Sequence, residues 1–134
     1  MHENPNLESY LVNTLSKIME KLKLESNTDR CTLVCDTLTQ DHPSLWKVQR
    51  VSKKFDDFSD LVDGKALTVH AFLIIGIGKK YFLVDPTFGQ FTGKKEIFVS
   101  EITGNYKNNC LKKLQKYNLP QKILHFYVNE IVKY

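Results

Sequence analysis

Two neighbouring strand-like segments limit what this chain can fold into more than any other feature. Residues 69–75 form the first segment and the second begins at residue 80, and both are rich in β-branched and aromatic residues. The short, glycine-rich stretch 76–79 between them favours a tight β-hairpin. His70 lies near the start of the first segment and Asp85 ends the second. Because these two ends meet in an antiparallel hairpin, we expect the imidazole and the carboxylate to lie close together.

A cysteine upstream of the hairpin adds a third chemical group. Cys31 follows residues 26–29 (Ser-Asn-Thr-Asp), whose side chains are typical helix N-caps, and the sequence predicts that a helix begins there. The first turn of a helix carries unpaired N–H groups and a partial positive charge, and an adjacent imidazolium stabilises a thiolate further. The order of the three groups therefore suggests a Cys-His-Asp nucleophilic site.

We expect Cys31, His70 and Asp85 each to have a role in acyl transfer. Cys31 would be the nucleophile, His70 the general base and acid, and Asp85 the group that orients the ring. The backbone N–H of Cys31, with a side-chain amide such as Asn27 or Gln90, could donate to an oxyanion. We also expect Cys31, as a cap-proximal residue, to contribute little to packing.

Other interpretations of the cysteines and of the histidine remain open. Cys35 lies one helical turn after Cys31 among apolar residues, which is typical of a buried small hydrophobe. Cys110 has a polar neighbourhood and is expected to be structural or incidental. His70 could be a core histidine bonded to a backbone carbonyl, and Asp85 could be a turn residue because a proline follows it.

A metal site is a poor match to the sequence. Cysteines and histidines that could contribute ligands are Cys31, Cys35, His42 and His70. A Cys-x3-Cys pair without a second tight pair departs from the spacing of structural zinc sites. We therefore expect neither a metal nor another cofactor.

Composition indicates a single globular domain over residues 1–134. The chain is 42% hydrophobic and 25% charged, which is ordinary for such a domain. Three cysteines without a framework spacing favour free thiols in a reducing, cytoplasmic compartment. No apolar run approaches the roughly 20 residues that a transmembrane helix needs. The polar start of the sequence shows no signal peptide.

The net charge of +4 comes almost entirely from lysine. The lysines are spread along the chain as pairs at 53–54, 79–80, 94–95 and 112–113. Proteins that bind nucleic acid usually cluster their basic residues on one surface. The pattern therefore favours a solvated surface, and we expect a monomer that binds neither nucleic acid nor membrane.

The predicted element order is α+β. An amphipathic helix is expected over residues 6–24 and a second from Cys31 to about residue 40, followed by a strand over 45–51. A turn-rich connection over 55–64 leads to the hairpin. A short edge strand at 96–99, a polar helix within 100–117 and a final strand at 123–132 complete the chain. We expect two N-terminal helices packed on a mostly antiparallel sheet.

The residues around His70 and Asp85 resemble those of papain-like and transglutaminase-like cysteine enzymes. In these enzymes a histidine opens one strand and an aspartate closes the next, often in an Asp-Pro-Thr stretch like that within residues 83–91 (Leu-Val-Asp-Pro-Thr-Phe-Gly-Gln-Phe). The interval from Cys31 to His70 and Asp85 is similar to that of bacterial toxin and effector domains that deamidate glutamine. The resemblance covers about residues 25–92.

This resemblance implies a papain-like core and a protein substrate that is reached in the host cytosol by a secreted effector. The activity it implies is deamidation of protein glutamine. Two alternatives remain open at this point. One is a peptidase or transglutaminase-like enzyme, which would need an extended cleft instead of a narrow pocket. The other is a non-catalytic protein-binding module that keeps the fold.

Overall fold

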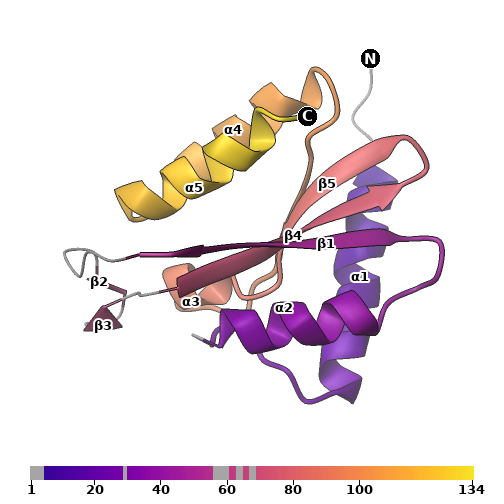
Figure 1. Ribbon diagram of the computed structural model, residues 1–134, viewed down its shortest axis with the longest axis horizontal. Coiled ribbons are helices and arrows are strands. Elements are labelled where there is room, and N and C mark those ends of the chain that lie inside the picture. The colour runs from indigo at the N-terminus through magenta and orange to yellow at the C-terminus, as the bar shows by residue number, and fades with distance from the viewer. Residues whose placement is uncertain (1–4, 29, 56–60, 63–64, 67–68) are drawn as a thin grey trace.

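A four-stranded antiparallel sheet forms the centre of the computed structural model (Figure 1). The structure describes residues 5–28, 30–55, 61–62, 65–66 and 69–134. In spatial order the strands are β1, β4, β5 and β6, which span Lys47–Lys54, Val69–Ile77, Lys80–Asp85 and Phe98–Glu101. The predicted hairpin is therefore confirmed as β4–β5, and the fold class is α+β.

Helices cover both faces of the sheet (Figure 1). On one face lie α1 and α2, which span Pro5–Lys21 and Cys31–Gln40. On the other face lie α4 and α5, which span Tyr106–Gln115 and Gln121–Ile131. The short helix α3, Gly89–Thr92, follows β5. Strands β2 and β3, Leu61–Val62 and Lys65–Ala66, pair separately from the main sheet.

The predicted final strand at residues 123–132 is wrong, because this segment forms α5. Its aromatic and β-branched composition suggested a strand. The buried side chains nevertheless recur at helical spacing, as in Ile123, Tyr127 and Ile131. Pro120 stands immediately before the helix, where a proline is tolerated because the first N–H groups lack helical partners.

The other predicted elements are present with shifted boundaries. The edge strand expected at 96–99 is β6, two residues later, and the helix expected within 100–117 is the shorter α4. Residues 56–60 and 63–64 of the predicted turn-rich connection lie outside the described residues.

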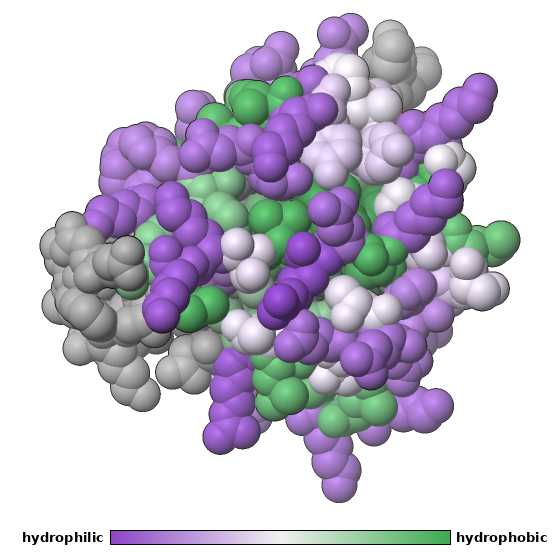
Figure 2. Space-filling view, viewed as in Figure 1, coloured by the Kyte–Doolittle hydropathy of each residue, from purple (hydrophilic) through white to green (hydrophobic). Residues whose placement is uncertain are grey.

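Strand alternation in β4 divides the core into two clusters. Ala71, Leu73 and Ile75 pack with α1 and α2. Phe72 and Ile74 point the other way and pack with α4 and α5. On the face seen in Figure 2, polar and charged side chains surround scattered apolar ones. Among the described residues, no helix combines the length and the apolar character that crossing a membrane requires.

Candidate active site

The β4–β5 hairpin brings His70 and Asp85 together. The strands pair from Leu73 opposite Val84 to Ile77 opposite Lys80. Continuing this register places His70 diagonally across from Asp85 on the same face of the sheet. The Nε2–H of His70 donates to Oδ2 of Asp85 at 2.7 Å, and both side chains are 0% exposed. The predicted contact between the two ends of the hairpin is confirmed.

Three further donors fix the position of the Asp85 carboxylate. Its Oδ1 accepts the backbone N–H of Thr87 at 3.0 Å and the hydroxyl of the same residue at 3.3 Å. Its Oδ2 also accepts the hydroxyl of Tyr127, whose oxygen lies 3.2 Å from Nε2 of His70. The carboxylate is thus bonded on both oxygens, which is what a buried charge requires.

Sequence reasoning missed Tyr127, the third member of this buried group. The residue belongs to α5, in the segment that was predicted to be a strand. The signal that could have located it is the apolar spacing of four residues around it, from Ile123 to Ile131. Burial, followed by the charge of Asp85 and the hydrogen bond to it, raises the pKa of Tyr127 well above its usual value. Tyr127 is therefore a neutral hydroxyl that donates.

The surroundings of His70 favour its charged form. Burial alone lowers the pKa of the ring. The charge of Asp85 and the hydrogen bond to it act in the opposite direction, as does a side-chain hydrogen bond with Cys31. Together these effects raise the pKa of His70 from 6.5 to about 9. At neutral pH the ring is an imidazolium.

Cys31 reaches His70 from the opposite face of the sheet. It is the first residue of α2, is 2% exposed and packs in the aliphatic cluster. Strand β5 pairs with β4 only as far as Leu73, so the first residues of β4 have no β5 partner. At this open end the Cys31 thiol donates to the Val69 carbonyl at 3.6 Å and interacts with the ring of His70. The thiol therefore meets the ring at the end of the strand.

The predicted capping of α2 is wrong in its details. The residue that precedes the helix is Arg30, and no described side chain caps the first turn. The Arg30 N–H instead donates to Oγ1 of Thr28 at 3.2 Å. Asp29, another predicted cap, lies outside the described residues. Cys31 nevertheless occupies the first turn, where the helix dipole favours a negative charge.

The other two cysteines have surroundings that oppose a thiolate. All three cysteines are free and buried. Burial, with a smaller effect from the charge of Asp85, raises the pKa of Cys35 far above the usual range. Burial also raises the pKa of Cys110 to about 11. The structure therefore agrees with the interpretation of Cys35 as a buried core residue.

Gln90 lies beside the ring of His70, but its amide is already engaged. Its Nε2–H donates to Oγ1 of Thr87 at 3.0 Å and lies 3.5 Å from Nδ1 of His70. The second distance is at the limit of a hydrogen bond. Gln90 Oε1 is buried without a partner among the described residues.

Asn27, the other candidate for binding an oxyanion, is exposed. Its backbone nevertheless lies against α3 because residue 89 is a glycine. A Cβ at Gly89 would lie 2.6 Å from the Ser26 carbonyl oxygen and 2.0 Å from that of Lys94. Gly89 therefore allows the segment before α2 to pack beside the residues that follow Asp85.

Aromatic rings enclose the histidine. Phe91, Tyr127 and Phe126 pack against the His70 ring with centroid separations of 5.0, 5.9 and 6.1 Å. Such edge-to-face contacts fix a ring as well as bury it. Within the described residues, no group of three or more His, Cys, Asp or Glu side chains could hold a metal ion. The site is thus a closed, rigid arrangement of a thiol, an imidazolium, a carboxylate and a phenol.

Comparison of the chain with protein families, with curated proteins and with solved structures gives no match.

Proposed function

We propose that this protein is a thiol-dependent acyl-transfer hydrolase that deamidates glutamine side chains of proteins. The observation that supports it most strongly is the bond from His70 Nε2 to Asp85. The ring held by that bond also interacts with the side chain of Cys31. A thiol, an imidazole and an orienting carboxylate in this relation form the arrangement used in nucleophilic catalysis.

The proposed reaction uses Cys31 as a thiolate beside the His70 imidazolium. The Cys31 thiolate attacks the carbon of the glutamine amide, and the His70 imidazolium protonates the nitrogen, so that the C–N bond breaks and ammonia leaves. The resulting thioester is attacked by water, which gives up a proton to the now neutral His70. The C–S bond then breaks, releasing glutamate and restoring the thiolate and imidazolium. Asp85 holds the ring in position throughout and stabilises its positive charge.

The burial of the Cys31 thiol favours deamidation over peptide cleavage. Cys31 is 2% exposed, and the ring that faces it is fully buried. A single protruding side chain is a better match to such a site than an extended backbone that has to occupy several subsites. The resemblance of residues 83–91 to papain-like and transglutaminase-like enzymes supports the same class of chemistry. The free thiols support a reducing compartment, such as the host cytosol.

A second function is favoured by the complete burial of His70 and Asp85. Under this alternative the polar group is structural, and the protein is a non-catalytic binding module. Buried ionic groups can be kept for conformational specificity, with no chemical role. The two functions differ in what they require of Cys31, since a structural thiol needs no nucleophilicity.

Mass spectrometry of a panel of purified, glutamine-containing proteins incubated with the chain tests the proposal. Deamidation replaces an amide NH2 by a hydroxyl and adds about one mass unit, whereas proteolysis yields fragments and transamidation yields cross-links. We expect the mass increase with wild type and with Cys35→Ala, and none with Cys31→Ala. An increase that persists in Cys31→Ala would contradict the assigned nucleophile. Fragments that depend on Cys31 would replace deamidation with peptidase activity.

A further inference from the structure

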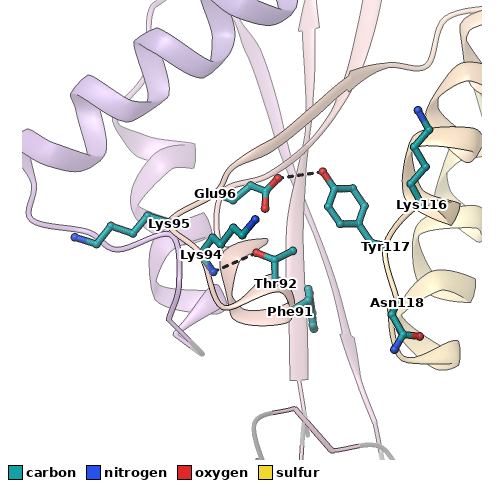
Figure 3. A pocket seen from close by; sticks show the side chains of 8 residues that line it. All are labelled: Phe91, Thr92, Lys94, Lys95, Glu96, Lys116, Tyr117 and Asn118. Carbon is teal, nitrogen blue, oxygen red and sulfur yellow. Dashed lines mark hydrogen bonds between the residues drawn. The ribbon is translucent and has the colours of Figure 1, made fainter.

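A hollow beside the site lies between α4 and the segment that joins α3 to β6 (Figure 3). Its volume is about 770 Å³. The side chains that line it are Phe91, Thr92, Lys94, Lys95, Glu96, Lys116, Tyr117 and Asn118. In Figure 3, Lys94 extends into the hollow and Lys95 points away from it. Lys116 stands on the opposite wall.

A second hollow continues the first along the outer side of β6. It has a volume of about 470 Å³ and shares Lys116 and Tyr117 with the first. Its floor consists of residues 97–99, and its other walls include Val12 of α1 and Lys113 of α4. The two hollows adjoin at Lys116 and Tyr117, and we call them together the lysine groove.

The lysine groove is positively charged. The ammonium groups of Lys94 and Lys116 form no ion pair with any described residue. The one carboxylate in the lining, on Glu96, accepts the hydroxyl of Tyr117 at 3.0 Å (Figure 3). Lys113 is paired with Glu8 of α1 at 3.0 Å. The groove therefore offers two cations without partners to a negatively charged ligand.

The floor of the groove is the outer edge of a β-sheet, because β6 is the last strand in the spatial order. The Ile102 N–H donates inward to the Tyr81 carbonyl at 2.9 Å, whereas the Glu101 N–H donates to a carboxylate oxygen of Glu8 at 2.8 Å. Strand alternation then directs the backbone groups of Val99 outward, into the groove. Among the described residues, the Val99 N–H makes no backbone hydrogen bond outside the pairing of the strands.

We propose that the lysine groove binds an extended, acidic segment of a partner protein, which adds to the sheet as a strand beside β6. Backbone bonds to Val99 would give affinity, as in other complexes formed by strand addition. Acidic side chains of the segment would pair with Lys94 and Lys116. The Glu8 carboxylate on Glu101 already shows that this edge accepts an acidic group.

The groove also ends close to the catalytic residues. Phe91 lines the first hollow and packs edge-on against His70, with 5.0 Å between ring centroids. A bound segment would therefore hold its protein next to the site. Binding itself does not depend on the proposed enzymatic function, because no group of the groove takes part in the chemistry.

Fluorescence anisotropy with a labelled peptide of alternating glutamate and valine tests the proposal on the full chain. The variant Lys94→Glu/Lys116→Glu should weaken binding by about tenfold or more, because two attractions become repulsions. The matched control Lys47→Glu/Lys79→Glu makes the same charge change on β1 and at the hairpin turn, and should bind as wild type does. Cys31→Ala should also bind normally, which separates binding from catalysis.

The variant Val99→Pro tests the strand addition separately. It removes the outward N–H at an edge position, where proline is tolerated, and should weaken binding while the melting temperature stays close to that of wild type. If Val99→Pro does not fold, the comparison of Lys94→Glu/Lys116→Glu with its control decides whether the proposal holds. Three results would overturn the proposal: no binding by wild type, equal weakening in the control, or equal binding of a lysine–valine peptide. Tighter binding of single-stranded RNA, weakened by the same lysine changes, would overturn it as well.

Discussion

The two faces of the central sheet carry different kinds of side chain. The face under α1 and α2 is packed with aliphatic and small side chains, such as Leu73, Ile75 and Cys35. The face under α4 and α5 is richer in aromatic side chains and encloses His70, Asp85 and Tyr127. The first face needs only the removal of apolar surface from water, whereas the second also buries polar groups that need hydrogen-bond partners.

The two faces should differ in how strongly a substitution lowers the free energy of unfolding. An aliphatic face tolerates small losses of volume, because its contacts are many and individually weak. The buried polar group is held by a few directional bonds, and losing one leaves a charge or a donor without a partner. Cys31 is the exception, since it packs with the aliphatic face and interacts with the polar group on the other.

Asp85→Ala should have the largest effect. It leaves the His70 ring and the Tyr127 hydroxyl buried without their shared acceptor, at a cost of about 3–5 kcal/mol in the free energy of unfolding. The control Asp36→Ala removes a carboxylate from an exposed pair with Arg50, which contributes at most about 1 kcal/mol. Urea denaturation of both variants measures the contrast, and equal losses would contradict it.

Tyr127→Phe should cost less, because the Asp85 carboxylate keeps its other donors. The expected loss is about 1–3 kcal/mol, the typical penalty for leaving a buried group without one partner. Tyr117→Phe is the matched control, since its hydroxyl donates to Glu96 in a half-buried position. A loss in Tyr117→Phe as large as that in Tyr127→Phe would show that burial of the phenol does not matter.

The pH dependence of stability should report the charge of His70. Its pKa in the folded protein is raised to about 9, above the ordinary value of 6.5. The stabilisation is therefore complete below pH 6.5, declines as the pH rises and is lost above about 9. Thermal melts of wild type should show this decline, and His70→Gln should lack it. A wild-type melting temperature that rises across the same interval would contradict a raised pKa.

Cysteine-to-alanine changes should have the smallest effects on stability. Cys31 is nearly as buried as Cys35, so the expectation that it contributes little to packing is wrong. Each change should cost about 1 kcal/mol through lost volume. Thermal melts should therefore give similar values for the two variants, and only activity should distinguish them. A loss of activity in Cys35→Ser at an unchanged melting temperature would identify Cys35 as the nucleophile.

The sequence predicts the hairpin and the His70–Asp85 contact because both depend on local signals. A glycine-rich turn between two β-rich segments determines the register, and register determines which ends meet. The contact with Tyr127 depends instead on how α5 packs on the sheet, which involves residues 42 positions from Asp85. The aromatic composition of α5 also obscured its helical period. Similarly, only the assembled fold places Cys31 at the open end of β4.

The central claim is that His70 activates the thiol of Cys31. Alkylation with iodoacetamide at pH 6, followed by peptide mapping, measures it most directly, because the reagent reacts with thiolates. Burial raises the pKa of Cys35 and Cys110, so these two thiols should react slowly. We predict that Cys31 is labelled first and that His70→Ala abolishes this preference. Equal, slow labelling of all three cysteines in the wild type would contradict the claim.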